Sequence, residues 1–453
     1  MPNVADLNRC EVAIVGGGFS GLACAKVLAD AGVDFQLIEA TGQLGGRART
    51  NYSVAPGFPA ELGALMVHGR KVVTHDWIRA HGLSARRLPT MQQARFCAEG
   101  RVSSLRGYWL PFRKPFGPGA FLEGAYRLPR LLRAHANGDL SVAAFLDRRH
   151  ASPGGRMLVT LLHCHAYAAD PEEIGVLGQV EEERFATERF GFANFQLREG
   201  YSELARRSAM PLLERIRLQT QVTDITWTPS GVTLELLRRG EPQSIALEAR
   251  YVVITVPLGV LKRQTIRFDP PLPEAKRKAI ERLGFGDGFS LQMRLGKGDL
   301  RRALGDFAQL WADGPTTFHR PVVGLGAAPE LLTAFTVGQE ARRRAHLPDS
   351  ELLAATLDEL RTSLPPRLEL GTVEAWAVHR WTTDPFFGGA YSYFPPGAGL
   401  ADRRVLAEPV DSTLCFAGEA THTLGESATV HGAIDTGIRA AKEVLRFRSS
   451  AGA

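Results

Sequence analysis

The chain has 453 residues, of which 44% are hydrophobic and 23% charged, a length that suits two domains or one large composite domain. The net charge of +6 is the difference between 54 basic and 48 acidic residues, and only 8 of the basic residues are Lys. Because the Arg residues are scattered along the chain, nucleic acid is not expected as a partner. No apolar run approaches the roughly 20 residues of a membrane span, and the first residues, MPNVAD, lack a basic region followed by an apolar one, so we expect a cytoplasmic protein without membrane contact.

The first thirty residues carry a nucleotide-binding pattern. An apolar, β-branched stretch, 12–15, runs into glycines at GxGxxG spacing, and residues 22–29 have helix-forming composition. Glycines permit the tight turn and a close approach of backbone to a pyrophosphate, and the helix N-terminus offers free N–H donors. We assign five residues to this loop: Gly16, Gly18, Phe19, Ser20 and Gly21.

A second strand is predicted over 33–38, and Glu39 and Ala40 follow at its end. An acidic side chain at this place accepts hydrogen bonds from a ribose and repels the additional phosphate of NADP. GxGxxG alone is weak evidence, because a plain glycine turn also produces it. Strand, helix, strand and terminal Glu together predict a dinucleotide site that includes Glu39 and Ala40, and the alternative is a βαβ unit that has lost its ligand.

The next loop contains paired glycines and a cation close to the predicted pyrophosphate. Gly45, Gly46 and Arg47 occur in the segment GGRART. The glycines make the loop flexible, and an Arg guanidinium can neutralise a phosphate with a forked, charge-assisted contact. We assign Gly46 and Arg47 to the cofactor site, although a lone Arg is more often a surface residue.

At this point the chain resembles the FAD-dependent amine oxidase superfamily, which includes monoamine oxidases, polyamine oxidases and lysine-specific histone demethylases. GGGFSG at 16–21, GGRART at 45–50 and ELGA at 61–64 carry the resemblance, which continues almost to the C-terminus. It implies an α/β fold of the amine oxidase and glutathione reductase type, in which a Rossmann-type FAD-binding domain is interleaved with an α+β substrate domain. The implied FAD-binding domain comprises 1–80, 195–275 and 395–453, and the implied substrate domain comprises 81–194 and 276–394.

The resemblance also places the segment 61–65 beside the flavin ring. It assigns Gly63, Ala64 and Leu65 to the cofactor and makes Glu61 a candidate catalytic residue. His68 matches a position at which several polyamine oxidases carry an active-site His or acid. A histidine in a surface loop is the alternative for His68.

The region from about 80 to 190 shows no second nucleotide motif. Apolar and Arg positions recur at helical spacing over 122–137, 140–149 and 156–169, which predicts helices of a substrate domain. His163 and His165 would diverge on a helix and make a poor chelate, and five cysteines without a CxxC pair indicate neither a disulfide framework nor zinc. We therefore expect no metal.

Beyond residue 199 the sequence predicts a helix, a strand at 221–225, a hairpin through Ser230 and Gly231, and a buried strand at 251–261. The resemblance implies that the backbone at Val222 contacts adenine.

Ser290 marks a departure from the family pattern. Family members commonly have a Lys here, which holds a water against flavin N5, and a neutral hydroxyl cannot supply that charge. Rapid reoxidation by oxygen is therefore in doubt, and Ser290 is a candidate catalytic position. Gln292, two residues on and on the same strand face, could hold a water instead.

The C-terminal third brings the remaining implied site residues. A helix over 350–364 and a strand over 373–378 are followed by Trp381, which the resemblance assigns to the flavin, and by FGGAYSYFPPG at 387–397. In monoamine oxidases the flavin-linking Cys falls at Ala390, so we expect non-covalent FAD. An aromatic-cage Tyr falls at Tyr391, whose π face would meet the substrate nitrogen.

The last segment, FAGEATH at 416–422 with ATVHGAIDTG at 428–437, completes the implied site. Gly418 and Glu419 are assigned to ribitol and pyrophosphate, and Thr429 and Val430 to the helix N-terminus that faces the flavin pyrimidine. The second cage aromatic of monoamine oxidases aligns near Thr429, so the cage is at most half present. Glu426 adds an acidic contact for a cationic substrate.

The function we expect is that of an FAD-dependent oxidase of a C–N bond. Hydride would pass from the carbon beside the amine nitrogen of a small amine or amide to flavin N5, giving an imine, and O2 would reoxidise the flavin to yield H2O2. The family often forms dimers, so a homodimer is left open.

Three alternatives remain beside this function. A tailoring oxidase of specialised metabolism would act on an amide or unusual amine and trap the iminium intramolecularly, which Ser290 and the depleted cage favour. The others are a carbon–carbon desaturase and a flavoprotein without enzymatic activity. Histone demethylation is not expected, because the chain lacks the additional N-terminal domain and long helical insertion of those proteins.

Overall fold

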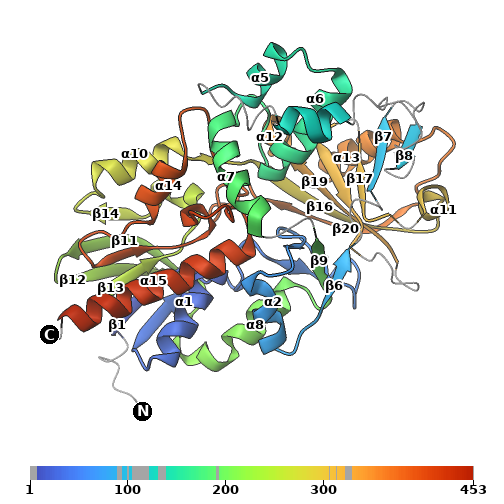
Figure 1. Cartoon of the computed structure of the whole chain (residues 1–453). Helices are drawn as coiled ribbons and strands as arrows, with labels where there is room; N and C mark the ends of the chain where they lie inside the picture. Colours follow the sequence, from blue (N-terminus) through green and yellow to red (C-terminus); the bar gives the residue numbers. More distant parts are fainter. Residues whose placement is uncertain are drawn as a thin grey trace.

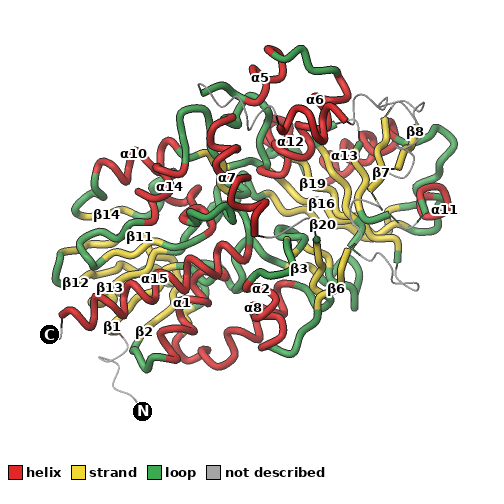
Figure 2. Tube along the Cα trace, in the orientation of Figure 1, coloured by secondary structure: helices red, strands yellow, loops and turns green. Residues whose placement is uncertain are grey.

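The computed structural model describes residues 8–88, 94–98, 101–104, 122–130, 139–189, 193–305, 307–312, 314–321 and 329–451. Two large β-sheets with helices packed against them dominate this part of the chain (Figures 1 and 2). The first sheet carries the predicted nucleotide pattern. In the view of Figure 1 it lies on the left, and the second sheet lies on the right.

The first sheet has the order β10-β2-β1-β13-β12-β11-β14, with β22 paired to β13. β1 lies between β2 and β13 and runs parallel to both. A strand segment covered on both faces is apolar, which explains the hydrophobic run 12–15 in the second half of β1, whereas Arg9 and Glu11 at its start keep contact with solvent. The strands are β1 (Arg9–Val15), β2 (Phe35–Ile38), β10 (Ile216–Arg217), β11 (Thr220–Thr228), β12 (Gly231–Arg238), β13 (Ser244–Ile254), β14 (Arg267–Asp269) and β22 (Leu414–Phe416).

Two helices cover one face of the first sheet. α1 (Phe19–Asp30) begins directly after the glycine loop, and the long C-terminal helix α15 (Val430–Ala451) packs beside it (Figure 1). Buried side chains from both helices form one apolar core with β1, including Ile14, Leu22 and Val444. Both helices therefore begin close to the carboxyl ends of the parallel strands, where dinucleotides bind in such folds.

The second sheet has the order β20-β16-β19-β18-β17-β7-β8 and is antiparallel apart from the β17–β7 pair. The strands are β7 (Ala94–Ala98), β8 (Arg101–Ser104), β16 (Gly288–Leu295), β17 (Gln309–Trp311), β18 (Thr316–His319), β19 (Glu330–Val337) and β20 (Val373–Arg380). α12 (Gly338–Arg344) and α13 (Asp349–Ser363) cover one face of it and share an apolar core with its strands.

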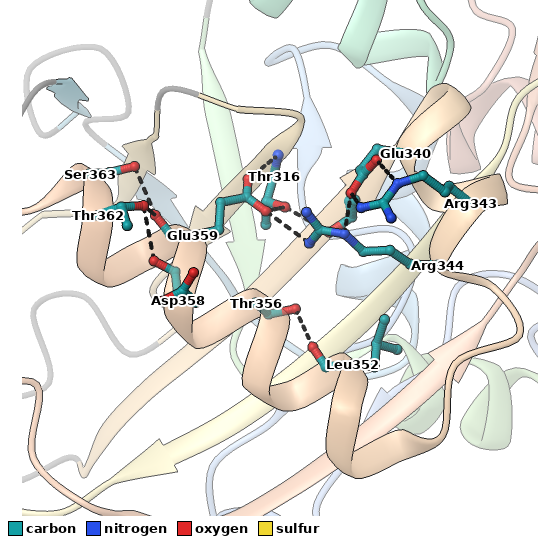
Figure 3. Close-up of polar contacts among 11 residues, drawn as sticks. Thr316, Glu340, Arg343, Arg344, Leu352, Thr356, Asp358, Glu359, Thr362 and Ser363 are labelled. Atoms are coloured by element: carbon teal, nitrogen blue, oxygen red, sulfur yellow. Dashed lines mark hydrogen bonds and ion pairs between the residues drawn. The ribbon is translucent and has the colours of Figure 1, made fainter.

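A polar network ties these two helices to the second sheet (Figure 3). Glu359 of α13 accepts hydrogen bonds from the backbone N–H of Thr316 at 3.0 Å and from its hydroxyl at 2.8 Å. The same carboxylate pairs with Arg344 of α12 at 3.0 Å, and Arg344 also pairs with Glu340. Because the network joins α12, α13 and β18, it fixes the outer layer behind the strands whose other side chains line the site.

Shorter elements connect the two sheets. Three small sheets pair β3 with β4, β15 with β21, and β9 with both β5 and β6. These strands are β3 (Thr50–Asn51), β4 (Ala60–Glu61), β5 (Val67–His68), β6 (Ala85–Leu88), β9 (Asn194–Leu197), β15 (Gly284–Phe285) and β21 (Ser392–Tyr393). The other α-helices of the described residues are α2 (Val73–Ala80), α5 (Val142–Arg148), α6 (Pro153–Val159), α7 (Val176–Arg189), α8 (Tyr201–Ala209), α9 (Leu258–Lys262), α10 (Glu274–Arg282), α11 (Leu300–Leu304) and α14 (Leu400–Ala407).

Two predicted elements differ in the structure. The strand predicted over 251–261 ends at Ile254, and α9 follows, because Pro257 lacks the N–H that a ladder needs and precedes the first turn of the helix. The helix predicted over 156–169 is α6 followed by a π-helical turn, Thr160–Cys164, and a 3-10 turn, His165–Tyr167. Of the helix predicted over 122–137, residues 122–130 are helical, and the remainder lies outside the described residues.

The strands of the first sheet fall within 1–80, 195–275 and 395–453, and those of the second within 81–194 and 276–394. The domain boundaries themselves stay a prediction.

Candidate active site

A cavity of about 510 Å³ runs between the carboxyl ends of the first sheet and one face of the second sheet. Every predicted cofactor residue except Gly21 lines it. Of the predicted catalytic residues, Tyr391 and His68 line it, whereas Ser290 and Glu61 do not. The structure thus brings segments from the whole length of the chain together around one space.

The glycine loop leaves room at one end of the cavity. Gly16 has a φ of +113°, and a Cβ on Gly21 would lie 2.0 Å from the carbonyl oxygen of Gly16, so both positions require glycine for the turn itself. A Cβ on Gly18 would have no protein atom nearer than the Cα of Gly46, at 4.0 Å, and would project into open space. This is the space that a pyrophosphate would fill, beside the N-terminus of α1.

Glu39 is held rigidly at the end of β2. Its carboxylate accepts three hydrogen bonds. The donors are the backbone N–H of Gly17 at 2.7 Å, the backbone N–H of Thr41 at 2.8 Å and the hydroxyl of Thr41 at 2.7 Å. The side chain lines the cavity next to Ala40. A carboxylate fixed by backbone donors presents its remaining lone pairs in one direction, as ribose binding at this position requires.

Arg47 and Glu419 form a partly buried ion pair in the cavity wall. Arg47 Nη1 donates to Glu419 Oε1 at 2.9 Å and to the carbonyl oxygen of Ala390 at 2.7 Å. Glu419 also accepts from the Ser392 hydroxyl at 2.7 Å and from the Ala428 N–H at 2.9 Å. Burial alone would raise the pKa of Glu419, but Arg47, the Ser392 hydroxyl and Arg403 outweigh it and lower the pKa below its usual range. Glu419 is therefore ionised and couples the glycine-rich loop to α15.

Ser290 and Trp381 hold the segment beside the predicted flavin position instead of facing the cavity together. The Ser290 hydroxyl donates to the carbonyl oxygen of Leu62, and the indole Nε1 of Trp381 donates to the same oxygen and to the Ser290 hydroxyl, each at 3.2 Å. Gln292 Nε2 donates to the carbonyl oxygen of Ala60 at 2.7 Å. One N–H of the Gln292 amide is thus bonded to the backbone, whereas its Oε1 is buried and has no hydrogen-bond partner among the described residues, so a water held by Gln292 stays a prediction. Trp381 alone of the three lines the cavity.

Glu61 lies behind the same segment and outside the cavity. Its carboxylate accepts from the Tyr201 N–H at 3.0 Å and from the Thr50 hydroxyl at 2.9 Å, which joins β4 to the start of α8. Burial raises the pKa of Glu61 to about 7. These contacts indicate a structural role and give no support to the predicted catalytic one.

His68 faces the cavity, not the outer surface. Its Nδ1 and Asn194 Oδ1 lie 2.8 Å apart, so Nδ1 carries the proton and donates to the amide oxygen. Burial lowers the pKa of His68, although the hydrogen bond with Asn194 opposes this shift. His68 is therefore a neutral imidazole whose Nε2 lone pair is left for other contacts.

Tyr391 lies in the cavity wall with Phe335, whose ring centroid is 6.5 Å from that of Tyr391. Burial raises the pKa of the Tyr391 phenol, which therefore stays protonated at neutral pH. Ala390, at the position of the flavin-linking Cys of monoamine oxidases, lines the same wall. Thr429, at the position of the second cage aromatic, caps α15: its hydroxyl accepts from the Gly432 N–H at 3.0 Å.

Glu426 does not reach the cavity as predicted. Its carboxylate lies 3.2 Å from Nε2 of His422, and Asp435 completes a group whose side-chain atoms lie within 4.8 Å of one another. Nδ1 of His422 accepts from the N–H groups of Leu424, at 3.3 Å, and Glu426, at 3.1 Å, so the ring proton must be on Nε2. That leaves no imidazole lone pair for a metal, and the group is better described as an internal hydrogen-bonded cluster.

The sequence does not predict the cavity residues contributed by the second sheet and the π-helical segment. We name six of them the substrate wall: Leu161, Leu162, His165, Trp311, His319 and Phe335. His319 and Thr317 are two residues apart on β18 and face the cavity together, as strand alternation requires. The π-helical turn shifts His165 out of the helical register, and a widened turn of this kind frequently marks a functional site.

Residues 19–445 match the family model described as flavin containing amine oxidoreductase. The chain belongs to this family. Curated relatives include polyamine oxidase 5 of Oryza sativa subsp. japonica, 28% identical over 97% of this chain and 88% of the relative. Amine oxidase [flavin-containing] B of Homo sapiens is 25% identical over 97% of this chain and 86% of the relative.

Solved structures of two oxidases share the fold. Cyclohexylamine oxidase from Brevibacterium oxydans has a TM-score of 0.81 and 24% identity, and covers 97% of this chain and 99% of its own. Wild-type putrescine oxidase bound to putrescine has a TM-score of 0.80 and 20% identity, with the same coverage.

Family and fold together confirm the predictions of an FAD-binding amine oxidase fold, an FAD cofactor and an oxidoreductase that acts on amines. None of the helices in the described ranges combines the length and apolar content that crossing a bilayer requires.

Proposed function

We propose that this flavin-containing amine oxidase dehydrogenates a small amine at the carbon next to nitrogen, giving an imine, and passes the two electrons to O2 to form H2O2. The observation that carries the proposal is the continuity of the cavity, which runs from Gly18 at the glycine loop to Tyr391 and the substrate wall. A substrate bound there would lie next to the cofactor end that reacts. Bound FAD supplies the acceptor for the hydride.

The residues around the reacting end bind and orient, and we assign no strong base to the step. Tyr391 offers a π face to the amine nitrogen, and its phenol stays protonated because burial raises its pKa. Gly63 and Ala64 carry backbone along the cavity wall, and Ser290 and Trp381 hold that backbone in place through Leu62. The N-terminus of α15, at Thr429 and Val430, lines the cavity and favours negative charge that develops near it.

The test is the absorbance of the purified holoenzyme near the flavin bands, recorded without oxygen while amines, polyamines, amino acids and cyclic amides are added. We expect one amine class to bleach the flavin and admitted air to restore the colour with release of H2O2. Bleaching by an amide alone would support the tailoring oxidase instead. Flavin that no amine bleaches would contradict the proposal.

A further inference from the structure

We infer that Glu182 is a positioning residue for the cofactor end of the site, because it fixes the loop from which α15 begins. Glu182 belongs to α7, which packs beside α14 (Figure 1). It is not one of the residues that line the cavity, so it acts through its neighbours. The inference concerns bound FAD and is independent of which amine is the substrate.

Glu182 holds Ser427, the residue just before the segment that lines the cavity. Its Oε1 accepts hydrogen bonds from the backbone N–H of Ser427 at 3.1 Å and from the Ser427 hydroxyl. Glu182 is 2% exposed and Ser427 is 5% exposed, so water does not compete for either bond. The loop before α15 is thus attached to a helix that lies 245 residues earlier in the chain.

The residue that follows this attachment has a strained backbone. Ala428 has a φ of +57°, a left-handed conformation that residues with a Cβ rarely adopt. Such a conformation persists only where the surroundings impose it. The bonds from α7 hold the preceding residue, and Glu419 Oε2 accepts from the Ala428 N–H at 2.9 Å. Because residues 428–430 line the cavity, the two carboxylates together determine where the first N–H groups of α15 point.

Arg403 of α14 keeps the Glu182 side chain in place. The guanidinium is fully buried, and its Nη2 lies 3.7 Å from Oε2 of Glu182. Its Nη1 donates to the carbonyl oxygen of Glu419 at 3.4 Å, and its Cζ lies 4.4 Å from the ring centroid of Phe394. Oε1 and Oε2 of Glu182 therefore have separate partners, and the side chain cannot turn away from the loop without losing both.

The position of this loop matters most for reduced flavin. A helix N-terminus attracts negative charge, and FAD gains negative charge when it takes up two electrons. Displacing residues 428–430 should therefore lower the midpoint potential of the flavin. Removing a nearby negative charge without displacement would raise the potential instead. The sign of the shift separates positioning by Glu182 from the direct effect of its charge.

The experiment measures the midpoint potential of the FAD-loaded protein by equilibration with a reference dye. Ser427→Ala removes the hydroxyl that donates to Glu182 and changes no charge, and Glu182→Gln keeps the size of the side chain. We expect each variant to weaken the preference for reduced over oxidised flavin about tenfold, which lowers the potential by about 30 mV for a two-electron couple. The double variant should show about the same shift as either single one, because both break one contact.

Glu181→Gln is the matched control on the same helix. Glu181 accepts from the N–H of Leu400 at 2.9 Å, at the start of α14, so E181Q removes an equal charge without touching the loop before α15. Its midpoint potential should equal that of the wild type. A higher potential in E182Q, an unchanged potential in S427A, or equal shifts in E181Q and E182Q would each overturn the inference. If E182Q does not retain FAD, the result for S427A decides.

Discussion

The pair of Arg47 and Glu419 shows at the scale of single residues how the cofactor site is held together. Both residues are predicted from sequence as direct cofactor contacts, yet in the structure one Nη atom of Arg47 is committed to Glu419 and Ala390. Removing the guanidinium would leave a buried carboxylate without its cation, which is costly because desolvation is then uncompensated.

Because FAD would then have to bring the segments of Arg47 and Glu419 into place as it binds, we expect Arg47→Met to raise the Kd of FAD by about 100-fold, which corresponds to about 2.8 kcal/mol at 1.4 kcal/mol per tenfold. The measurement is titration of deflavinated protein with FAD, followed by quenching of flavin fluorescence. Arg79→Met is the matched control, since Arg79 pairs with Asp76 on an exposed face of α2. FAD affinity equal to that of the wild type in R47M would show that the pair does not organise the site.

Tyr391 allows a test that separates an aromatic face from a hydroxyl. If the ring orients the amine nitrogen, Tyr391→Phe keeps the π face and should retain most of kcat/KM, whereas Tyr391→Ala should lower it by roughly ten- to a hundredfold, about 1–3 kcal/mol. Steady-state kinetics with the best amine of the panel measure this, and flavin absorbance confirms that cofactor content is unchanged. Equal losses in both variants would point to the phenol as the functional group.

Residues are predictable where a motif encodes their geometry in its own spacing. Gly16, Gly18 and Glu39 reach the cavity because strand, turn and helix are contiguous in sequence. Ser290 is different: whether its hydroxyl faces the cavity or the backbone depends on Leu62, which only the folded chain brings beside it. Glu426 turns toward His422 through a local loop geometry that carries no sequence pattern.

At the scale of elements, two lysine side chains each donate hydrogen bonds to the C-terminal carbonyl groups of a neighbouring helix. Lys276 of α10 donates to the carbonyl oxygens of Val405 at 2.8 Å, Leu406 at 3.0 Å and Glu408 at 2.6 Å, at the end of α14. Lys262 likewise donates to three carbonyl oxygens at the end of α10. Each lysine satisfies acceptors that a helix end otherwise leaves to water.

Lys276 gives a prediction about pH. Burial lowers the pKa of Lys276 from 10.5 to about 7, so between these values the unfolded chain holds a proton that the folded chain has released. Stability then rises with pH in this window, by up to about 1.4 kcal/mol per unit. We expect the free energy of unfolding of the wild type, measured by urea titration, to increase relative to that of Lys276→Met as the pH rises from 7.5 to 9.5.

The matched control for Lys276 is Lys278→Met on the same helix. Lys278 is exposed and pairs with Glu274, so its replacement should leave the pH dependence of stability unchanged. A constant difference between wild type and K276M across the window would show that the buried amine keeps its proton.

The N-terminus of α15 provides the second prediction at this scale. The Thr429 hydroxyl accepts from Gly432 N–H and also donates to the Glu426 carbonyl oxygen at 2.6 Å. Thr429→Ala should cost about 1 kcal/mol of stability, the usual value of an N-cap, and Thr429→Ser should restore most of it. Urea unfolding measures both, and equal stability of T429A and wild type would contradict the cap.

Elements are predictable from periodicity, and their interruptions are not. The helix predicted over 350–364 corresponds to α13 (Asp349–Ser363), because its apolar stripe and the following prolines are visible in sequence. The π-helical turn at Thr160–Cys164 has no comparable signal, since it depends on how α6 packs against its neighbours. That turn decides that His165 lines the cavity, which is why the substrate wall escapes prediction.

At the scale of the whole molecule, the cavity lies where the two sheets meet, and its walls come from both. The family resemblance predicts this architecture, but the character of the pocket depends on Trp311, His319 and Phe335, which occupy three separate strands. Their convergence follows from the antiparallel register of β17, β18 and β19, because the register determines on which face of the sheet each side chain lies.

Because FAD would contact residues of both sheets, its removal should weaken the whole molecule. A ligand bound only to the folded state adds RT ln(1 + [L]/Kd), about 4 kcal/mol at a concentration a thousand times Kd. We expect the deflavinated protein to unfold at a lower temperature than the holoenzyme and to recover its Tm when FAD is added back. Ala390 carries no nucleophile, so acid precipitation should leave the flavin in the supernatant. Scanning calorimetry of both forms, with AMP as a control that fills only the adenine end, measures the effect. If FAD and AMP raised the Tm equally, the isoalloxazine end would not bridge the two sheets.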